Sequence, residues 1–319
     1  PVKWPDAVRD LAQGSDAVIC NFEGCLPPDG AWPMKRKTIH AAHAQAPHML
    51  AGLGVTHLAL ANNHMWDYGH AGILSTRAAI ERTGIVAAGA GLSGDEAAAP
   101  ALRNGVALLS ADAGPTPDWA IAGPGPGVNA IAIRRQLCLP AGTIAQLSRI
   151  AAETGEAQRR ARRQAIGYDR PETGASFYGI PLLQADHAAE VWQADPQATA
   201  RLVRDIQAAR RKADVVLVAI HYHHWAVEWS QAPDWLSQLA TELMAAGADG
   251  VIGTGPPVVA PVAVHGSRVF APGLGNLVFH TARGAGYDRL NIPVWQGTAL
   301  QYDNGVWSAH PVDVLRPPA

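Results

Sequence analysis

The segment HLALANNH, residues 57–64, joins a short apolar run to three polar side chains. The run His57–Ala61 has the length and composition of a buried strand, and it leads directly into Asn62, Asn63 and His64. In α/β sheets, ligands bind at the carboxyl ends of the strands. Amide and imidazole side chains at such a strand end can bind a ligand or take part in catalysis. The segment therefore predicts a strand that ends at a functional site.

The rest of the chain repeats an alternation of short apolar runs and amphipathic segments. Helices are expected at 43–53, 72–83, 196–212 and 234–246. Further strands are expected at 17–20, 86–88, 106–111, 215–220, 250–253, 262–265 and 268–271, and Asn304-Gly305 predicts a hairpin turn within 301–307. Strands separated by helices form βαβ units with a largely buried sheet, so the chain is predicted to be an α/β protein.

A stretch rich in proline and glycine, 114–128, interrupts this alternation and is expected to be a loop. Two helices are predicted after it, at 140–155 and 156–166, whereas 168–195 has no clear pattern. We expect one domain over residues 1–319, with a helical insertion at 114–196. The second predicted helix contains four arginines, which form either a solvated face or a local site for an anionic substrate: Arg159, Arg160, Arg162 and Arg163.

The composition excludes several classes of protein. Hydrophobic residues make up 48% of the 319 residues and charged residues 16%, a balance that forms a large core rather than a disordered chain. The formal net charge of −2 gives no overall basic field for nucleic acid. Three cysteines make no disulfide framework, and no apolar run is long enough for a transmembrane helix. The compartment, cytoplasm or cell envelope, and the oligomeric state stay open. The chain opens on Pro1, so an upstream segment is expected to have been removed or to lie outside this sequence.

Polar side chains follow the other predicted strands as well. Asn21 and Glu23 come after 17–20, and a histidine-rich run comes after 215–220. Because these strand ends meet at one edge of a sheet, we expect a shared cleft suited to a divalent metal or to acid–base chemistry. On an extended strand His221 and His223 share a face that His224 does not, so one or two of the three are expected to line the cleft. The histidines at 40, 43, 48 and 57 are expected to be structural or surface residues.

An ordered series of motifs resembles the CapA family of poly-γ-glutamate capsule biosynthesis proteins over nearly the whole chain. The series is Asn21-Phe22-Glu23-Gly24, Ala61-Asn62-Asn63-His64 with Asp67-Tyr68-Gly69, Gly89-Ala90-Gly91, His224-Trp225 with Glu228, Ala246–Asp249, and Gly273-Leu274-Gly275-Asn276 with Phe279. The family is similar to calcineurin-like metallophosphoesterases. The resemblance implies a four-layer α/β/β/α sandwich of the metallo-dependent phosphatase type, with a metal site at the strand ends.

The resemblance also implies roles for individual residues. Asn21, Glu23, Asn63 and His224 are expected to be metal ligands, and His64, His224 and Glu23 to be catalytic, with His64 as a general acid. The remaining polar and aromatic residues of the motifs and strand ends are expected to bind substrate. They are Asn62, Trp66, His221, His223, Trp225, Glu228 and Asn276.

Two departures from the family pattern reduce the expected ligand set. The family opens with a strand that ends in a metal-binding Gly-Asp, and this sequence begins after that point. The family's Gly-His-x-Pro-His motif appears here as Gly253-Thr254-Gly255-Pro256-Pro257. Threonine is a poor ligand for transition metals and proline offers none. We therefore expect at most one divalent ion (Mn, Zn, Mg or Ca) instead of a two-metal centre.

Three functions remain open from the sequence. The first is a metal-assisted hydrolase or transferase acting on a peptide, a γ-glutamyl polymer or a phosphoester. The second is a metal-independent acid–base enzyme on a peptide, such as an epimerase. The third is a non-catalytic binding module for capsule assembly. In each case the expected partner is a peptide or polyglutamate-like molecule.

Overall fold

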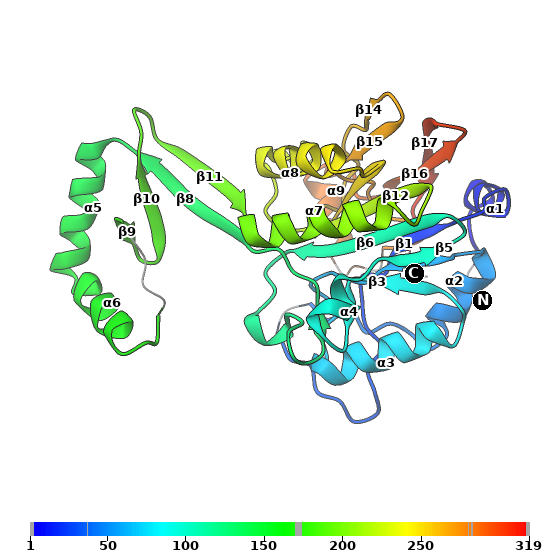
Figure 1. Cartoon of the computed structure of the whole chain (residues 1–319), viewed down its shortest axis with the longest axis horizontal. Coiled ribbons are helices and arrows are strands. Elements are labelled where there is room, and N and C mark those ends of the chain that lie inside the picture. The colour runs from blue at the N-terminus through cyan, green and yellow to red at the C-terminus, as the bar shows by residue number, and fades with distance from the viewer. Residues whose placement is uncertain (1–2, 37, 170–173, 280, 282, 317–319) are drawn as a thin grey trace. The chain divides into compact units, whose positions relative to one another are not determined.

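The computed structural model describes residues 3–36, 38–169, 174–279, 281 and 283–316. The chain divides into two compact units, one made of residues 1–132 and 196–319 and the other of residues 133–195. Both contain helices and strands, so the predicted α/β class is confirmed (Figure 1).

A three-stranded parallel sheet forms around β2 (His57–Ala59), whose residues are all buried. It lies between β1 (Ile19–Asn21) and β3 (Val86–Ala88). Side chains from α1 (Asp6–Gln13), α2 (Ala46–Leu53) and α3 (Gly69–Glu81) join Leu58 in one hydrophobic cluster. The predicted strands and helices of this region are confirmed, with their ends shifted by a few residues.

A six-stranded sheet forms the second layer of strands in this unit, in the order β14-β15-β13-β12-β6-β5. The four inner strands are parallel, and both edge strands are antiparallel to their neighbours. Their bounds are β5 Ala101–Arg103, β6 Val106–Ala113, β12 Val215–Tyr222, β13 Gly250–Thr254, β14 Ala263–His265 and β15 Arg268–Ala271. Because β12 continues two residues past its predicted end at 220, His221 lies inside the sheet, between Asp112 on β6 and Thr254 on β13.

Small apolar residues let the two sheets come together. Ala59 and Ala88 form a hydrophobic cluster with Leu108, Leu217 and Ala219 of the six-stranded sheet. The far side of that sheet is covered by α7 (Pro196–Arg210), which packs on β6 and β12, and by α8 (Asp234–Ala245), which packs on β13 (Figure 1). Two sheets with helices beside each therefore form the core of the first unit.

Gly89 shows why one of the motif glycines is needed. Its φ of 100° is a conformation that side chains disfavour, and a Cβ there would lie 2.6 Å from the backbone nitrogen of Ala61 and 2.7 Å from Ser110 Oγ. The same Ser110 hydroxyl accepts a hydrogen bond from Ala61 N at 3.2 Å. Gly89 thus allows the end of β2 to pack closely on β6, which brings the polar residues after both strands together.

Several short elements complete the first unit. They are β4 (Ala90–Gly91), α4 (Gly94–Ala98), a 3-10 helix at Asp118–Ala120, β7 (Gly127–Val128), α9 (Gly284–Arg289) and the hairpin β16 (Gln296–Asp303) and β17 (Val306–Asp313). Asn304 and Gly305 both have positive φ, 47° and 88°, as the tight hairpin turn requires, so that predicted turn is confirmed.

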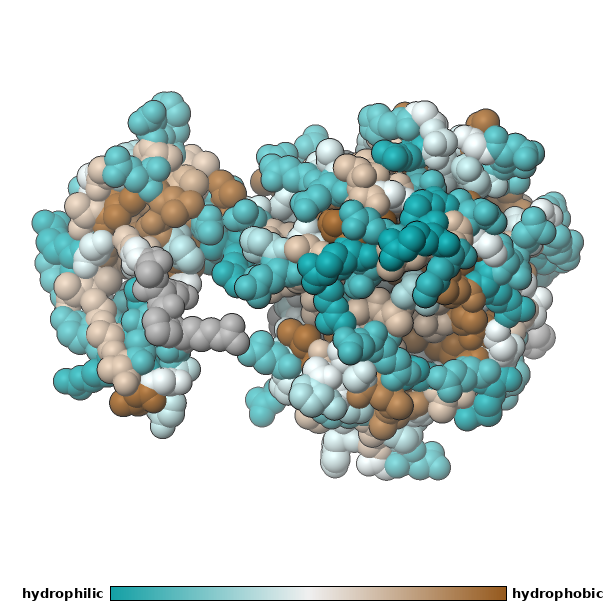
Figure 2. All heavy atoms as spheres, in the orientation of Figure 1, coloured by the Kyte–Doolittle hydropathy of each residue, from teal (hydrophilic) through white to brown (hydrophobic). Residues whose placement is uncertain are grey.

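The second compact unit combines helices with a small sheet. Helices α5 (Ala141–Glu153) and α6 (Glu156–Ala165) match the two predicted helices. A four-stranded sheet, in the order β11-β8-β10-β9, was not predicted; its strands are β8 Ile133–Leu139, β9 Ser176–Phe177, β10 Ile180–Gln184 and β11 Ala189–Ala194. Only Leu182 among their residues is buried, which explains the weak apolar pattern. Figure 2 shows hydrophobic residues on the visible face of this unit. Leu183 and Val191 are among the exposed hydrophobic residues of its sheet.

The predicted insertion, 114–196, contains this second unit but begins earlier in the chain. Residues 114–132 belong with the first unit, where Val128 is buried and β7 pairs with β4. Whether residues 1–319 behave as one domain stays a prediction. Over the stretch that the structure describes, no helix is both long enough and apolar enough to cross a membrane.

Candidate metal centre

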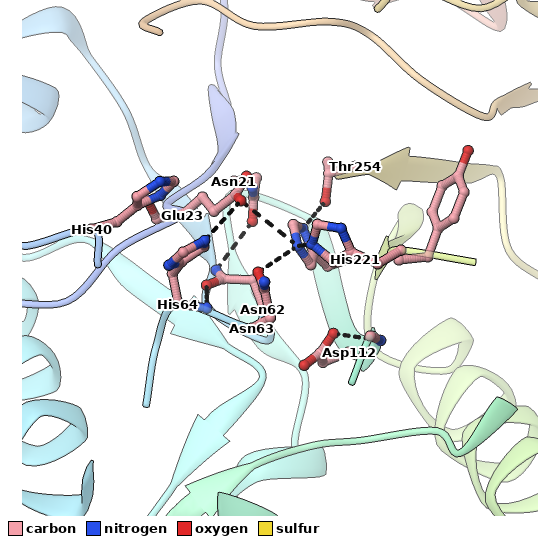
Figure 3. Close-up of polar contacts among 12 residues, drawn as sticks. Asn21, Glu23, His40, Asn62, Asn63, His64, Asp112, His221 and Thr254 are labelled. Atoms are coloured by element: carbon pink, nitrogen blue, oxygen red, sulfur yellow. Dashed lines mark hydrogen bonds and ion pairs between the residues drawn. The ribbon is translucent and has the colours of Figure 1, made fainter. Parts of the chain in front are cut away.

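Polar side chains from five strands of the first unit meet at one edge of its two sheets (Figure 3). Asn21 ends β1 and Glu23 follows it, Asn62, Asn63 and His64 follow β2, and Asp112, His221 and Thr254 come from β6, β12 and β13. The sequence predicts that these strand ends meet. The contacts among their side chains define the chemistry that the site can perform.

Asn62 fixes the two loops that carry the site. Its Nδ2 donates to the carbonyl oxygen of Phe22 at 2.8 Å, and its Oδ1 accepts from the backbone N–H of His64 at 3.1 Å. The side chain is fully buried. These bonds tie the loop that contains Glu23 to the turn that contains His64. The substrate contact predicted for Asn62 stays a prediction, and its polar atoms are already engaged within the protein.

His64 is held by a buried carboxylate and a lysine. Its Nδ1 lies 2.8 Å from Asp67 Oδ2, and Lys35 Nζ lies 2.5 Å from Asp67 Oδ1. Burial alone would raise the pKa of the Asp67 carboxyl, but hydrogen bonds from His64 and Lys35 outweigh it, and the pKa lies below its usual value. Asp67 is therefore a carboxylate, and it directs His64 Nε2 toward Glu23, 3.8 Å away.

Three potential ligand atoms lie close to a fourth, His221 Nε2. His221 Nε2 lies 3.0 Å from Asn63 Oδ1, 3.2 Å from His223 Nε2 and 3.8 Å from Glu23 Oε1. Ligand atoms of Glu23, His221 and His223 all lie within 4.8 Å of one another. The other ring nitrogen of His221, Nδ1, lies 3.0 Å from Thr254 Oγ1. Carboxylate, amide and imidazole groups at these separations can hold a metal ion.

The electrostatics of this group favour neutral imidazoles. Burial, followed by repulsion from neighbouring histidines, lowers the pKa of His223 to about 4 and that of His221 well below its usual value. Burial, and then repulsion from the Asp112 carboxyl, raise the pKa of Glu23 to about 7. At neutral pH both imidazoles therefore have a lone pair available for a cation.

A second group of potential ligands shares Glu23. Ligand atoms of Glu23, His40 and His64 also lie within 4.8 Å of one another. The rings of His40 and His64 stack with 3.5 Å between their centroids and 7° between their planes. The prediction that His40 is structural or on the surface is untested, but the structure places this side chain against His64.

Asn21 and His224 are the other residues predicted to be metal ligands. Asn21 Oδ1 accepts a long hydrogen bond, 3.4 Å, from Asn62 Nδ2. The ring of His224 lies 6.4 Å from that of Trp235, and its carbonyl oxygen accepts a hydrogen bond from Trp235 Nε1. The metal roles predicted for Asn21 and His224 thus stay predictions, and over the described residues the two groups of histidine and carboxylate ligands do not include His224.

Four of the predicted substrate-binding residues, two tryptophans among them, differ in their contacts. Trp225 lies 5.5 Å from the ring of His223, and Trp66 packs beneath Lys35 Nζ at 4.6 Å from the ring centre. Glu228 is exposed, and Asn276 donates to the carbonyl oxygen of Pro257 at 3.3 Å. Of these four residues, Trp225 contacts a candidate ligand, His223, and Trp66 contacts Lys35.

Three neighbours of the centre were missed as site residues by sequence analysis. Asp112 is fully buried, accepts hydrogen bonds from Gly114 N and Thr116 Oγ1, and burial raises its pKa to about 6. The strand-end rule would have found it had the strand predicted at 106–111 been extended by one residue. Lys35 lies in a long loop whose sequence has no periodic pattern, so no signal pointed to it. Thr254 was predicted only to be a position where the family's histidine ligand is missing.

The fold is that of an α/β protein with residue groups at its strand ends that could hold a metal ion. The chain belongs to the bacterial capsule synthesis protein PGA_cap family, whose model matches residues 3–281. That family lies in the metallophosphoesterase-like superfamily, so the resemblance seen in the motifs is confirmed.

The individual relatives share only moderate sequence identity with this chain. An uncharacterized protein of Sinorhizobium fredii is 26% identical over 281 residues, which cover 82% of this chain and 56% of the relative. The PGA biosynthesis protein CapA of Bacillus subtilis is 36% identical over 90 residues, 28% of this chain and 22% of the relative. A Mycobacterium tuberculosis protein named "Probable polyglutamine synthesis accessory protein" is 32% identical over 89 residues, 28% and 23% of the two chains. The chain thus spans about half the length, or less, of these curated relatives.

Proposed function

We propose that this protein is a metal-assisted hydrolase or transferase that acts on a glutamate polymer or a related peptide in capsule metabolism. One observation supports it most strongly: His221 Nε2 lies 3.0 Å from Asn63 Oδ1, 3.2 Å from His223 Nε2 and 3.8 Å from Glu23 Oε1. Two neutral imidazole nitrogens this close share at most one hydrogen bond, whereas a cation between them satisfies every one of these atoms.

The donor set suits a divalent ion. With Nδ1–H of His221 donating to Thr254 Oγ1, the Nε2 lone pair points to Asn63, His223 and Glu23, as ligating histidines require. A divalent ion bound by these residues would supply Lewis-acid polarisation of a carbonyl or phosphoryl oxygen and would lower the pKa of a bound water. The donor set does not define which ion binds, since nitrogen and oxygen ligands are both present.

His64 is the proposed acid–base residue. Its Nδ1 is held at 2.8 Å by the Asp67 carboxylate, which fixes the tautomer and the orientation of the ring. Its Nε2 faces the Glu23 side of the centre, where it can hold a proton and deliver it to the leaving nitrogen or oxygen of a substrate. The stacked ring of His40 keeps His64 from rotating.

The substrate class rests on the family and on the names of relatives. The family description names bacterial capsule synthesis, and the Bacillus subtilis relative is named as a PGA biosynthesis protein. A γ-linked glutamate polymer offers amide carbonyls for hydrolysis or transfer. Trp225, beside His223, is positioned to contact such a chain.

The four-layer α/β/β/α arrangement is part of the same proposal. Its support is the cluster that joins the two sheets through Ala59, Ala88, Leu108 and Leu217, with α1–α3 beside one sheet and α7 and α8 beside the other. That order of layers brings the ends of β2 and β12 to a single edge, as the contact between Asn63 and His221 requires.

The test uses the purified full chain with added Zn²⁺ or Mn²⁺, assayed on poly-γ-glutamate, a γ-glutamyl peptide and a phosphodiester. Hydrolysis of at least one of these is expected, and EDTA should abolish it. His64→Asn and His221→Asn should lower the rate by about 100-fold or more, while His48→Asn, an exposed histidine on α2, should not change it. A rate that survives EDTA, or that is unaffected by His64→Asn, would contradict the proposal.

A second candidate, metal-independent acid–base catalysis on a peptide, has one observation in its favour. The pKa of Glu23 is raised to about 7 and that of Asp112 to about 6, chiefly by burial, so both carboxyls can exchange protons near neutral pH. Incorporation of deuterium into a glutamyl peptide, in heavy water with EDTA present, would support this candidate. Incorporation that occurs only with added metal would exclude it.

A further inference from the structure

Two long stretches of the sequence contain no acidic residue, and both contribute to the candidate centre. Residues 30–66 have no aspartate or glutamate, and neither do residues 250–287. The first stretch includes His64, and the second includes Thr254. Both stretches contain basic residues, so the surface where they meet is expected to be positively charged and to attract anions.

Arg283 connects the two stretches beside the centre. Its Nη2 donates a hydrogen bond to Thr38 Oγ1 at 2.8 Å, across 245 positions of the chain. Thr38 lies two residues before His40, whose ring stacks on that of His64 with 3.5 Å between the centroids. Two residues of extended chain span at most about 7 Å. The Arg283 guanidinium therefore lies on the His64 side of the centre.

Arg36 and Arg283 form what we call the basic rim. Both side chains are exposed, and within the part of the chain that the structure describes no ion pair joins either guanidinium to a carboxylate. Lys35 differs from them, because its Nζ lies 2.5 Å from Asp67 Oδ1 and over the ring of Trp66. The charge of Lys35 is thus used within the protein, whereas the two arginines can bind an anion from solvent.

The opposite side of the centre is aromatic. Glu23 Oε1 lies 3.8 Å from His64 Nε2 and 3.8 Å from His221 Nε2, so it stands between the two histidines (Figure 3). Trp225 packs against the ring of His223, on the His221 side. A chain that crosses the centre would therefore meet an uncharged aromatic ring on one side and cations on the other.

We propose that the basic rim binds carboxylates of an anionic polymer and so places the chain across the centre. This inference rests on the proposed function for the class of substrate, and it names the residues that select it. A γ-linked glutamate polymer has one free carboxylate on each residue, so separate guanidiniums match successive carboxylates. Arginine suits this task, because its planar fork binds a carboxylate through two parallel hydrogen bonds.

The test measures binding of a fluorescent γ-glutamate oligomer to the full chain by anisotropy, at low salt and with EDTA present. Arg36→Gln and Arg283→Gln should each weaken binding about two- to fivefold, as exposed ion pairs do, and the double variant more than either. Arg283→Lys keeps the charge and should bind more tightly than Arg283→Gln. Because the assay needs no turnover, it reports on the basic rim independently of catalysis.

Arg82→Gln is the matched control. Arg82 is exposed at the end of α3, and that helix of 13 residues begins two residues after Asp67. At 1.5 Å per residue, Arg82 lies about 20 Å along the helix from the centre. Its replacement removes the same charge as the rim variants and should leave binding at the wild-type level.

Salt and a neutral polymer give readouts that do not depend on the folding of a variant. Binding to the wild type should weaken as salt is raised, and an oligomer whose carboxylates are methyl esters should bind at least about fivefold more weakly. Equal binding of the acid and the ester, or an affinity that salt does not change, would overturn the inference. Equal binding by the wild type and the double rim variant would also overturn it.

The outcomes separate this inference from the proposed function. Metal-dependent hydrolysis together with wild-type binding by the rim variants would overturn the basic rim and leave the proposed function standing. Weakened binding by the rim variants, with no hydrolysis of any substrate, would support the rim and contradict the proposed catalysis.

Discussion

Thr254 stands where the resemblance predicts a histidine ligand, and its hydroxyl lies 3.0 Å from Nδ1 of His221. In the proposed centre it therefore orients a ligand instead of being one. Thr254→Val keeps the shape of the side chain but removes this acceptor, so the zinc affinity of the site with His221 should fall about 10- to 100-fold. Thr254→Ser keeps the hydroxyl and should stay close to wild type. A competition titration with a chromophoric chelator measures both, and equal affinities for valine and wild type would refute the role.

The burial of His57 should make the stability of the protein depend on pH. The side chain is fully buried in the three-stranded sheet, Nδ1 lies 2.8 Å from Thr56 Oγ1, and Nε2 has no hydrogen-bond partner. Burial lowers the pKa of His57, so the folded state disfavours the charged form that the unfolded chain takes up below about pH 6.5. Stability contributed by neutral His57 should thus be lost as pH falls from 7 to 5.

The measurement compares urea unfolding of the wild type and His57→Gln at pH 7 and pH 5. Buried Glu23 has a raised pKa and acts in the opposite direction, and other buried histidines act in the same direction. The comparison removes these shared contributions. The variant should lose less unfolding free energy than the wild type over this interval, and an equal or larger loss would show that His57 does not titrate as argued.

Residue by residue, the sequence indicated which side chains come together at the strand ends better than it indicated the contacts that each one makes. The two-residue periodicity of a strand indicated that His221 and His223 share a face, and the structure brings their Nε2 atoms together. The choice of His224 as a ligand came from the resemblance, and its ring lies near Trp235 instead. His40 was treated as structural, because a stacked pair formed across 24 positions of the chain leaves no local pattern.

At the scale of elements, Lys35 anchors the long loop between β1 and α2. Asp67 receives Lys35 Nζ and the backbone N–H of His40, and its carbonyl oxygen accepts the N–H of Met34. Lys35→Met would leave the fully buried Asp67 carboxylate without its cation. The free energy of unfolding should fall by about 3 kcal/mol, and amides of residues 34–40 should exchange faster with solvent.

Urea unfolding and hydrogen exchange measure these two effects. The double variant Lys35→Met with Asp67→Asn removes both charges and should recover part of the lost stability. An unchanged exchange rate in the loop, together with wild-type stability, would show that the ion pair does not hold the loop in place.

Elements with a strong apolar pattern were predicted and those without it were not. The inner strands at 106–111 and 215–220 are continuous apolar runs, and the structure confirms both with extensions at their ends. The sheet of the second unit lacks that pattern because most of its residues are partly exposed. The long loop that holds Lys35 and His40 is defined by polar contacts with residues far along the chain, which periodicity does not reveal.

At the scale of the whole molecule, the candidate centre lies entirely in the first unit. Each of its ligand residues falls within 1–132 or 196–319, and none falls within 133–195. Replacing 133–195 by a flexible Gly/Ser linker should therefore leave zinc binding unchanged, with the same stoichiometry by dialysis. Loss of zinc binding in a variant that still unfolds cooperatively would show that the second unit contributes to the site.

The four arginines of α6 lie outside the candidate centre, in the second unit. No residue of α6 is buried, Arg163 pairs with Asp169 at 2.8 Å, and Arg159 donates to the carbonyl oxygen of Thr154. Two of the four are thus engaged within their own unit, which favours a solvated face. A site for an anionic substrate on this helix stays a prediction, testable by salt-dependent binding of polyglutamate.

The central claim is a cation held by Asn63, His221 and His223 beside Glu23. The most direct measurement is anomalous diffraction at the zinc absorption edge from crystals of the full chain grown with one equivalent of Zn²⁺. The account predicts a peak about 2.0–2.3 Å from the Nε2 atoms of His221 and His223. A map without a peak among these residues, at full occupancy of zinc elsewhere, would contradict it.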